Sequence, residues 1–177
     1  MIRKLLQRLT DTSDGGKHLP WITRRVMAWL SGFNADKYWH RQFLVANPQA
    51  KVNPLLKAYY LLWIKRVDSK HNCSFGTSFN RGMRAIPPPY LPHGPNGIIV
   101  GGDAKIGRGC IIYHQVTIAG GGVVIGDYVE LGAGAKVLPN VKIGNHVHVG
   151  ANCVVVEDIP DYATVVLQKP RIIEKAN

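Results

Sequence analysis

Between residues 100 and 155 a branched aliphatic residue recurs at every sixth position, with one interval of seven. The recurring residues are Val100, Ile106, Ile112, Ile118, Ile125, Leu131, Val137, Ile143, Val149 and Val155. A second, smaller set follows four positions later: Ala104, Cys110, Val116, Val129, Ala135, Val141, Val147 and Cys153. A period of six fits neither an α-helix nor an alternating strand. It predicts a parallel β-helix, in which stacked coils of short strands bury one another's apolar faces.

Glycine and proline mark the corners and the start of this repeat. Glycine follows six of the ten aliphatic residues, at corners where a Cβ would obstruct the turn. The interval of seven contains Gly120-Gly121-Gly122, which we expect to form a small protruding loop. The three prolines in Ile86–Tyr90 lack N–H donors, so this segment is not expected to pair as a central strand. It should instead deliver residues 91–93 to the start of the regular repeat.

The first part of the chain has helical signals instead. Apolar residues at positions 22, 26, 29 and 30 form a helical stripe, which Pro20 can open and Gly32 can end. Asn34 is expected to cap a second helix, which carries Trp39 and Phe43 and stops before Pro48.

A third helix should begin at Asn53-Pro54 and run from Leu55 to about Val67. Its sequence is apolar nearly all round, which favours burial between helices or subunits, with a membrane surface as the alternative. We therefore divide the chain into a basic, aromatic-rich helical region (1–72), a β-helix (73–160) and a C-terminal tail (161–177).

Positive charge is concentrated in the helical region. The chain carries a net charge of +11; residues 1–72 hold 13 Lys and Arg against 4 Asp and Glu, which is +9, and the remainder contributes +2. Such a region suits an anionic neighbour, such as acidic lipid headgroups or a phosphorylated substrate, or it is a solvated surface. No nucleic-acid-binding motif or aromatic stacking platform is present, so we expect no nucleic-acid partner.

The longest apolar run is too short to span a bilayer, and the N-terminus lacks the apolar core of a signal peptide. We therefore expect a cytoplasmic protein, with peripheral contact at the inner face of the membrane as an option. The three cysteines do not form a disulfide framework. Cys110 and Cys153 are predicted to be buried small hydrophobes, and the role of Cys73 is open.

Because aliphatic rows fill the interior of a β-helix, a site must lie on its outside, most simply in a groove between copies. His93 stands in a loop of prolines and glycines, and histidine is the usual base for an alcohol at neutral pH. His114 should face outward as a second base or an acceptor-positioning group. A loop histidine without chemistry and a histidine buried between subunits are the respective alternatives. His146 and His148 have the wrong spacing for a metal and should be solvent-exposed.

Two segments resemble a known family. They read HGPNGIIVGGDAKIGRGCIIYHQVTIAGG and GAGAKVLPNVKIGNHVHVGANCVVVEDIPDYATVV, and the similarity covers roughly residues 73–172. The family is that of the hexapeptide acyltransferases, in the branch that contains serine O-acetyltransferases and the O-acetyltransferases of surface-polysaccharide clusters. The resemblance implies a mainly β fold with a left-handed parallel β-helix. It also implies a homotrimer that binds acetyl-CoA in the groove between neighbouring copies.

The resemblance also assigns residues. The catalytic histidine of the family falls on His93. Contacts to the CoA arm fall on Ala119, Gly120, Ala133 and Ala151, with Lys136, Lys169 and Arg171 near the phosphates. No metal ion is expected.

Three departures from the serine enzymes bear on the acceptor. An acidic residue precedes the catalytic histidine there, whereas Pro92 stands here; their loop with a second histidine is reduced to residues 120–122; and their helical region is longer. These departures favour a sugar hydroxyl of a surface-polysaccharide precursor, with serine as the alternative amino-acid acceptor. Two other classes are a zinc-dependent β-helical carbonic anhydrase, for which the spaced histidines are lacking, and a non-enzymatic trimeric scaffold, which would not bind acetyl-CoA.

Overall fold

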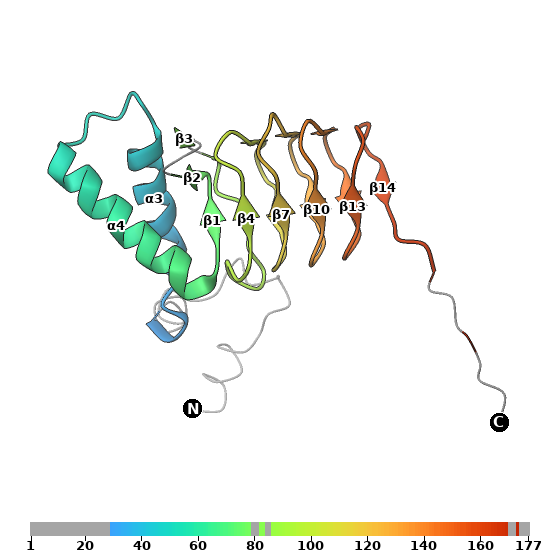
Figure 1. Ribbon diagram of the computed structural model, residues 1–177, viewed down its shortest axis with the longest axis horizontal. Coiled ribbons are helices and arrows are strands. Elements are labelled where there is room, and N and C mark those ends of the chain that lie inside the picture. The colour runs from blue at the N-terminus through green and yellow to red at the C-terminus, as the bar shows by residue number, and fades with distance from the viewer. Residues whose placement is uncertain (1–28, 79–81, 84–85, 170–172, 174–177) are drawn as a thin grey trace, which may run out of the picture.

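The structure is a computed structural model that describes residues 29–78, 82–83, 86–169 and 173. Two helices cover one end of a stack of short strands, and the tail leaves the other end (Figure 1). The predicted start of the first helix at Pro20 and the basic lead before it lie outside the described residues. Residues 29–31 are helical, and the helix ends as predicted at Gly32, which has a φ of 70°.

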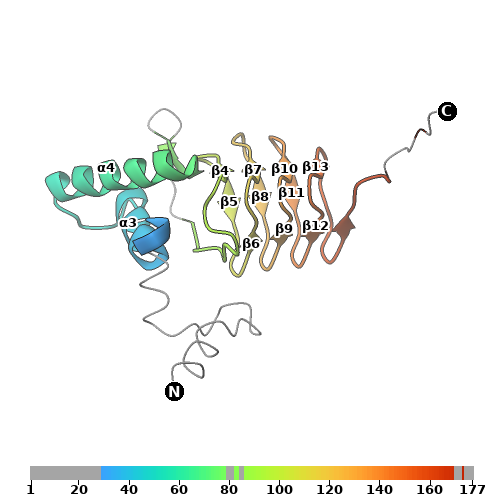
Figure 2. The ribbon, with the colours of Figure 1, turned by 90° about the horizontal axis from the view of Figure 1, so that it is seen from below.

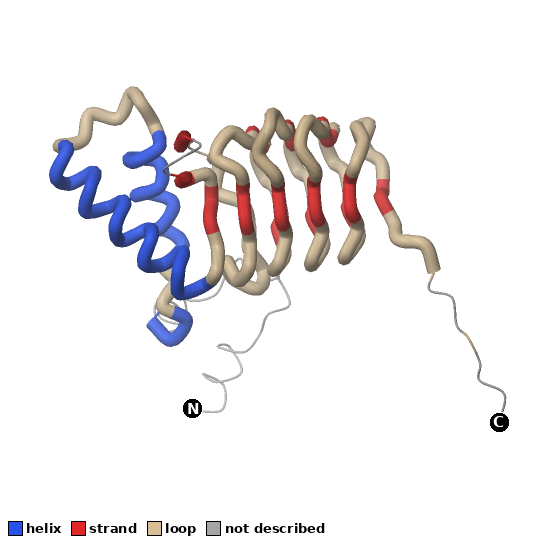
Figure 3. The backbone as a smooth tube through the Cα atoms, viewed as in Figure 1, coloured by secondary structure: helices blue, strands red, loops and turns tan. Residues whose placement is uncertain are grey.

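The stack is a parallel β-solenoid of about four turns and fits the left-handed β-helix expected from the resemblance. Its strands form three parallel sheets, in the orders β1-β4-β7-β10-β13, β11-β8-β5 and β14-β12-β9-β6, which run as rows along the stack (Figures 2 and 3). The strands are β1 Ser74–Phe75, β4 Ile99–Val100, β5 Lys105–Ile106, β6 Ile111–Ile112, β7 Thr117–Ile118, β8 Val124–Ile125, β9 Glu130–Leu131, β10 Lys136–Val137, β11 Lys142–Ile143, β12 His148–Val149, β13 Val154–Val155 and β14 Thr164–Val165. A small antiparallel pair, β2 Thr77–Ser78 and β3 Gly82–Met83, lies near the helices.

The interior of the stack confirms that both residue series predicted from the sequence point inward. Every aliphatic residue of the six-residue series and every residue of the smaller series is buried. Each strand contributes one inward and one outward residue, so adjacent coils meet through the inward ones. The corners are equally tight, because a Cβ on Gly101 would overlap with the backbone of Gly120 in the next coil.

The triple glycine forms a loop on one corner, as predicted. Gly121 and Gly122 are exposed and have φ values of 84° and 82°, which glycine adopts without strain. Their N–H groups donate to the Asp103 carboxylate at 2.8 and 3.1 Å. Val123 then returns the chain to the core, so the extra residue leaves the stacking intact.

Both predicted helices in the described part of the basic region are present. Helix α3 spans Ala35–Ala46, and helix α4 spans Pro54–His71, four residues beyond the predicted end. The side chains of Asn34 and Asn53 accept hydrogen bonds from the first turns of α3 and α4, as expected for N-caps.

Within a single chain α4 is buried along one stripe only, and its burial between subunits stays a prediction. Only Ile64, Val67 and Asp68 are buried, along the stripe that faces the rest of the protein. Leu55 and Leu62 are 82% and 68% exposed on the opposite side. An apolar pattern predicts that a helix has partners, but it does not say whether they belong to the same chain.

Aromatic side chains join the helices to the first coil. The ring of Trp39 lies 5.0 Å from that of Phe75 on β1, and Tyr38 lies 5.8 Å from the same ring. The hydroxyl of Tyr38 donates to Asp68 at 2.6 Å, and burial is the main cause that raises the pKa of this carboxyl group. The packing fixes the end of α4 beside the start of the β-helix, where the loop that carries His93 lies.

The three cysteines are free and buried. This confirms the prediction for Cys110 and Cys153. Burial raises the pKa of Cys73 to about 12, with the neighbouring Asp68 as the next cause. This cysteine is therefore a protonated, packed thiol at neutral pH rather than a nucleophile.

Candidate active site

One β-bridge explains why His93 and His114 meet. Tyr90 pairs in parallel with Ile111, because it follows the prolines and has an N–H group to donate. His93 and His114 each come three residues after a member of this pair, so they occupy the same corner of successive coils. Continued along the sheet, the same register brings Ala133 and Ala151 to that corner.

Turns and a side-chain hydrogen bond fix the loop that presents His93. Gly94 and Gly97 have φ values of 70° and 69°, and the Gly94 N–H donates to the Leu91 carbonyl at 3.1 Å. Asn96 donates from its side chain to the His93 carbonyl at 3.2 Å. The imidazole is therefore exposed on a constrained backbone, as expected from the sequence.

The two imidazoles form a direct pair. Nδ1 of His93 lies 2.8 Å from Nδ1 of His114, and the ring centroids are 4.9 Å apart. A hydrogen bond between two ring nitrogens requires that one carries the proton and the other its lone pair. If His93 donates from Nδ1, its Nε2 keeps a lone pair that can accept a proton from a substrate. The hydrogen bond to His114 then keeps His93 in the tautomer that a general base needs.

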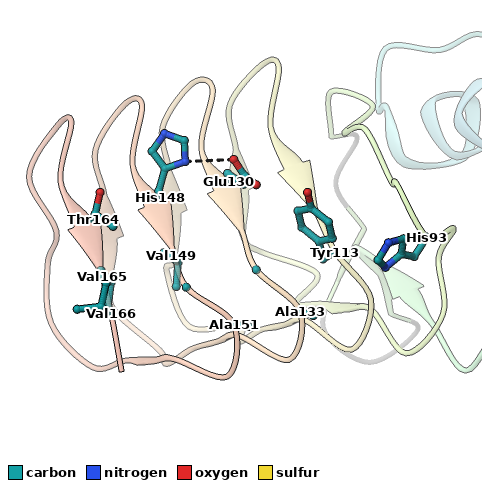
Figure 4. Close-up of a pocket in the computed structure, with 12 residues that line it drawn as sticks. His93, Tyr113, Glu130, Ala133, His148, Val149, Ala151, Thr164, Val165 and Val166 are labelled. Atoms are coloured by element: carbon teal, nitrogen blue, oxygen red, sulfur yellow. Dashed lines mark hydrogen bonds and ion pairs between the residues drawn. The ribbon is translucent and has the colours of Figure 1, made fainter. Parts of the chain in front are cut away.

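A groove of about 460 Å³ starts at His93 and runs along the outer face of the β6–β9–β12–β14 sheet (Figure 4). The lining residues are His93, Tyr113, Glu130, Gly132, Ala133, His148, Val149, Gly150, Ala151, Thr164, Val165 and Val166. The ring of Tyr113 meets that of His93 edge-on, with 5.4 Å between centroids. The groove is long, open and mostly apolar, which suits an extended ligand whose reactive end lies beside His93.

Tyr113, Glu130 and His148 form a polar cluster within this apolar lining. Nδ1 of His148 lies 3.1 Å from Oε2 of Glu130. The charge of Glu130, followed by burial and a hydrogen bond to the same carboxylate, raises the pKa of Tyr113. Glu130 thus lies on the wall of the groove between Tyr113 and its hydrogen-bonding neighbour His148 (Figure 4).

The predicted CoA contacts lie at two different corners. Ala133 and Ala151 line the groove, after β9 and β12. Ala119 and Gly120 lie between β7 and β8, at a corner that the groove of the same chain does not reach. The structure therefore brings together only part of this set within one chain.

Lys136 and Lys169, which were predicted to contact the CoA phosphates, do not line the groove. Lys136 is exposed on β10 and donates from Nζ to the Gly134 carbonyl at 3.2 Å. Lys169 is exposed in the tail, and Arg171 lies outside the described residues.

The polar groove residues Tyr113, Glu130, His148 and Thr164 were not predicted from the sequence to belong to the site. His146 and His148 are both exposed, as predicted, but only His148 lines the groove, and Tyr113 and Glu130 were not considered. The period of the repeat could have predicted that Glu130 and His148 are neighbours. They lie three six-residue steps apart, which is one full coil, and therefore stack on one face.

Two features are absent from the described part of the chain. It contains no group of three or more His, Cys, Asp or Glu side chains that could hold a metal ion. None of its helices is both long enough and apolar enough to cross a membrane.

Comparison with known proteins supports the resemblance. Residues 122–156 match the family described as bacterial transferase hexapeptide (six repeats). A serine acetyltransferase of Staphylococcus aureus (strain Mu50) is 43% identical over 98 residues, which cover 51% of this chain and 46% of the relative. The chain therefore matches less than half the length of this relative.

Solved structures give the same answer for the fold. A soybean serine acetyltransferase complexed with serine has a TM-score of 0.55 and 28% identity, covering 81% of this chain and 57% of the other. A serine acetyltransferase in complex with CoA has a TM-score of 0.56 and 26% identity, covering 76% and 53% respectively. The resemblance to hexapeptide transferases, in the branch of the serine enzymes, is confirmed.

Proposed function

We propose that this chain is an acetyl-CoA-dependent O-acetyltransferase and that its acceptor is L-serine. The observation that carries the proposal is the His93–His114 pair at the end of a long apolar groove, on a fold similar to serine acetyltransferases. The sugar acceptor expected from the sequence has no support from these comparisons, which fit the serine alternative better.

His93 acts as the general base in direct transfer. Its Nε2 takes the proton of the acceptor hydroxyl, and the oxygen attacks the thioester carbonyl of acetyl-CoA. The tetrahedral intermediate collapses with cleavage of the carbon–sulfur bond, and protonated His93 returns the proton to the thiolate. His114 accepts the hydrogen bond from Nδ1 throughout and stabilises the cation that forms on His93.

Product identification tests the acceptor. The purified protein is incubated with acetyl-CoA and either L-serine or a panel of free and nucleotide-linked sugars, and the products are analysed by mass spectrometry. We expect O-acetylserine. An acetylated sugar without O-acetylserine would replace serine by the second candidate, which Pro92 favours because it leaves the residue before His93 uncharged.

His114 is proposed as a positioning residue. His114→Ala should lower kcat by about 10–100-fold, the usual cost when a functional histidine loses the partner that orients its ring. KM for acetyl-CoA should change little, because His114 does not line the groove. His114→Gln offers a side-chain oxygen to Nδ1 of His93 and should restore much of the loss. Equal losses in both variants would contradict an orienting role.

The proposal includes a homotrimer. Ala119 and Gly120 lie at one corner of the β-helix, and Ala133 and Ala151 lie at another. A single CoA arm can therefore contact both sets only when it lies between two copies of the chain. The outward side chains Ile99 and Val154 on the β4–β7–β10–β13 face are apolar and partly exposed, which suits such an interface. Light scattering of the purified protein should give three times the mass of the chain.

The outer face of α4 is proposed to contact anionic membranes. Leu55, Tyr59, Leu62 and Arg66 are exposed at helical spacing, within a region of high positive charge. The protein should co-sediment with vesicles that contain phosphatidylserine more than with phosphatidylcholine alone, and salt should weaken this difference. Leu62→Glu should reduce sedimentation, whereas Val156→Glu, at an exposed position of the prism, should not. Equal sedimentation with both vesicle types would refute the contact.

A further inference from the structure

We infer that Glu130 is the specificity-determining residue of the acceptor subsite and that its carboxylate receives the ammonium group of L-serine. This inference rests on the proposed function and adds to it a residue and the chemistry that it recognises. Among the described residues that line the groove, Glu130 is the one with an acidic side chain. An amino-acid acceptor brings a cation into this groove, and a carboxylate is the side chain that binds an ammonium group most strongly.

The neighbours of Glu130 hold its carboxylate in place without saturating it. The hydroxyl of Tyr113 is close enough for the charge of Glu130 to raise its pKa, and Nδ1 of His148 lies 3.1 Å from Oε2. A carboxylate offers about four acceptor positions, so two such contacts orient the group and leave room for a ligand. The side chain is one-third exposed, toward the groove that it lines. A carboxylate on a β-strand with a hydrogen-bonding neighbour is a more precisely placed group than one on a free loop.

Tyr113 lies between His93 and Glu130 along the groove (Figure 4). The ring of Tyr113 meets that of His93 edge-on, and the charge of Glu130 raises the pKa of the Tyr113 hydroxyl. Two hydrogen bonds of about 3 Å each, together with a similar separation of the nitrogen and the hydroxyl oxygen within serine, span roughly 9 Å. The inference places the hydroxyl of serine at Nε2 of His93 and its ammonium group at Glu130.

The charge pattern around His93 gives a second reason. The residue before His93 is Pro92, so the catalytic loop from Leu91 to Gly97 contains no acidic side chain. The other residues along the groove are apolar, hydroxyl-bearing or imidazole groups. Of the groove-lining residues in the described part of the chain, only Glu130 adds an opposite charge that would distinguish an amino acid from a neutral alcohol.

Steady-state kinetics of Glu130→Gln tests the inference. Glutamine keeps the shape and an acceptor oxygen for Tyr113 but loses the charge. We expect KM for L-serine to rise about 10–100-fold, as for the loss of a charged hydrogen bond, while KM for acetyl-CoA and kcat change less than about threefold. Glu157→Gln is the matched control, because Glu157 is exposed and lies outside the groove, and its kinetics should equal those of the wild type.

A second substrate distinguishes the effect of the lost charge from a change in the fold of the variant. With 3-hydroxypropionate, which has the hydroxyl and carboxylate of serine but no ammonium group, Glu130→Gln should have the same kcat/KM as the wild type. The inference is overturned if KM for L-serine is unchanged, if the loss is equal for both acceptors, or if KM for acetyl-CoA rises instead. Wild-type protein that transfers acetyl to a sugar but not to L-serine, or to neither, overturns the proposed function along with it. If the wild type acetylates L-serine and Glu130→Gln has the same KM for L-serine, this inference alone is overturned.

Discussion

His93→Ala is expected to lower kcat for acetyl transfer by about 10²- to 10⁴-fold, the usual contribution of a general base. The loss arises because the acceptor hydroxyl would have to attack the thioester with its proton still attached. The side chain is exposed, and its backbone is held by turns, so alanine should leave the fold unchanged. Binding of acetyl-CoA, measured by calorimetry, should therefore persist while turnover falls.

His146→Ala is the matched control for this variant. His146 is also exposed, but it stacks between Tyr128 and Tyr162 and does not line the groove. Its removal should leave kcat within about twofold of the wild type, as is usual for a surface position away from the chemistry. Equal rates for wild type and His93→Ala would remove His93 from the mechanism.

Ile118→Ala should lower the free energy of unfolding by about 2–5 kcal/mol, the range for truncating a buried isoleucine. Ile118 is fully buried in β7, where it stacks on Val100 and Val137 of the adjacent coils. The loss combines the burial of three carbon atoms with a cavity that two neighbouring coils line. Urea unfolding followed by circular dichroism, at one fixed protein concentration, measures the change.

Lys105→Ala provides the comparison on the opposite face. Lys105 lies on β5, outside the face proposed for the trimer interface, and its side chain points outward and is exposed. Its truncation should cost less than about 1 kcal/mol, because most of the lost contact is with solvent. Similar losses for the two variants would mean that the two faces of the strands have been assigned wrongly.

The sequence was sufficient to predict the β-helix because the period of six directly reflects how its coils stack. Each aliphatic residue of the six-residue series, such as Ile118 or Leu131, points inward in the structure, and the single interval of seven residues forms a loop. The hand of the helix came from the resemblance, since spacing carries no information about chirality.

The site was predicted only as separate residues. His93 and His114 were each proposed for chemistry, but their contact depends on the bridge between Tyr90 and Ile111. That bridge lies where the prolines interrupt the repeat, so the register of the first coil could not be counted from the sequence. Outward positions such as Glu130 carry no periodic hydrophobic signal, and a groove becomes visible only when neighbouring coils are stacked.

The acceptor illustrates a different limit of sequence reasoning. Pro92 and the short glycine loop pointed to a sugar, because they remove groups that the serine enzymes carry at those positions. The folded chain offers a carboxylate elsewhere, on β9, beside the same groove. A missing residue at one position does not exclude a ligand when a different strand can supply the same charge.

The central claim is that this chain transfers acetyl from acetyl-CoA to a hydroxyl acceptor with His93 as the base. Its most direct test is the rate of thiol release from acetyl-CoA, with and without L-serine, for the wild type and His93→Ala in parallel. We predict release that depends on L-serine in the wild type and falls by at least about 100-fold in the variant. No acceptor-dependent release with L-serine or any sugar, or equal release in both proteins, would contradict the account.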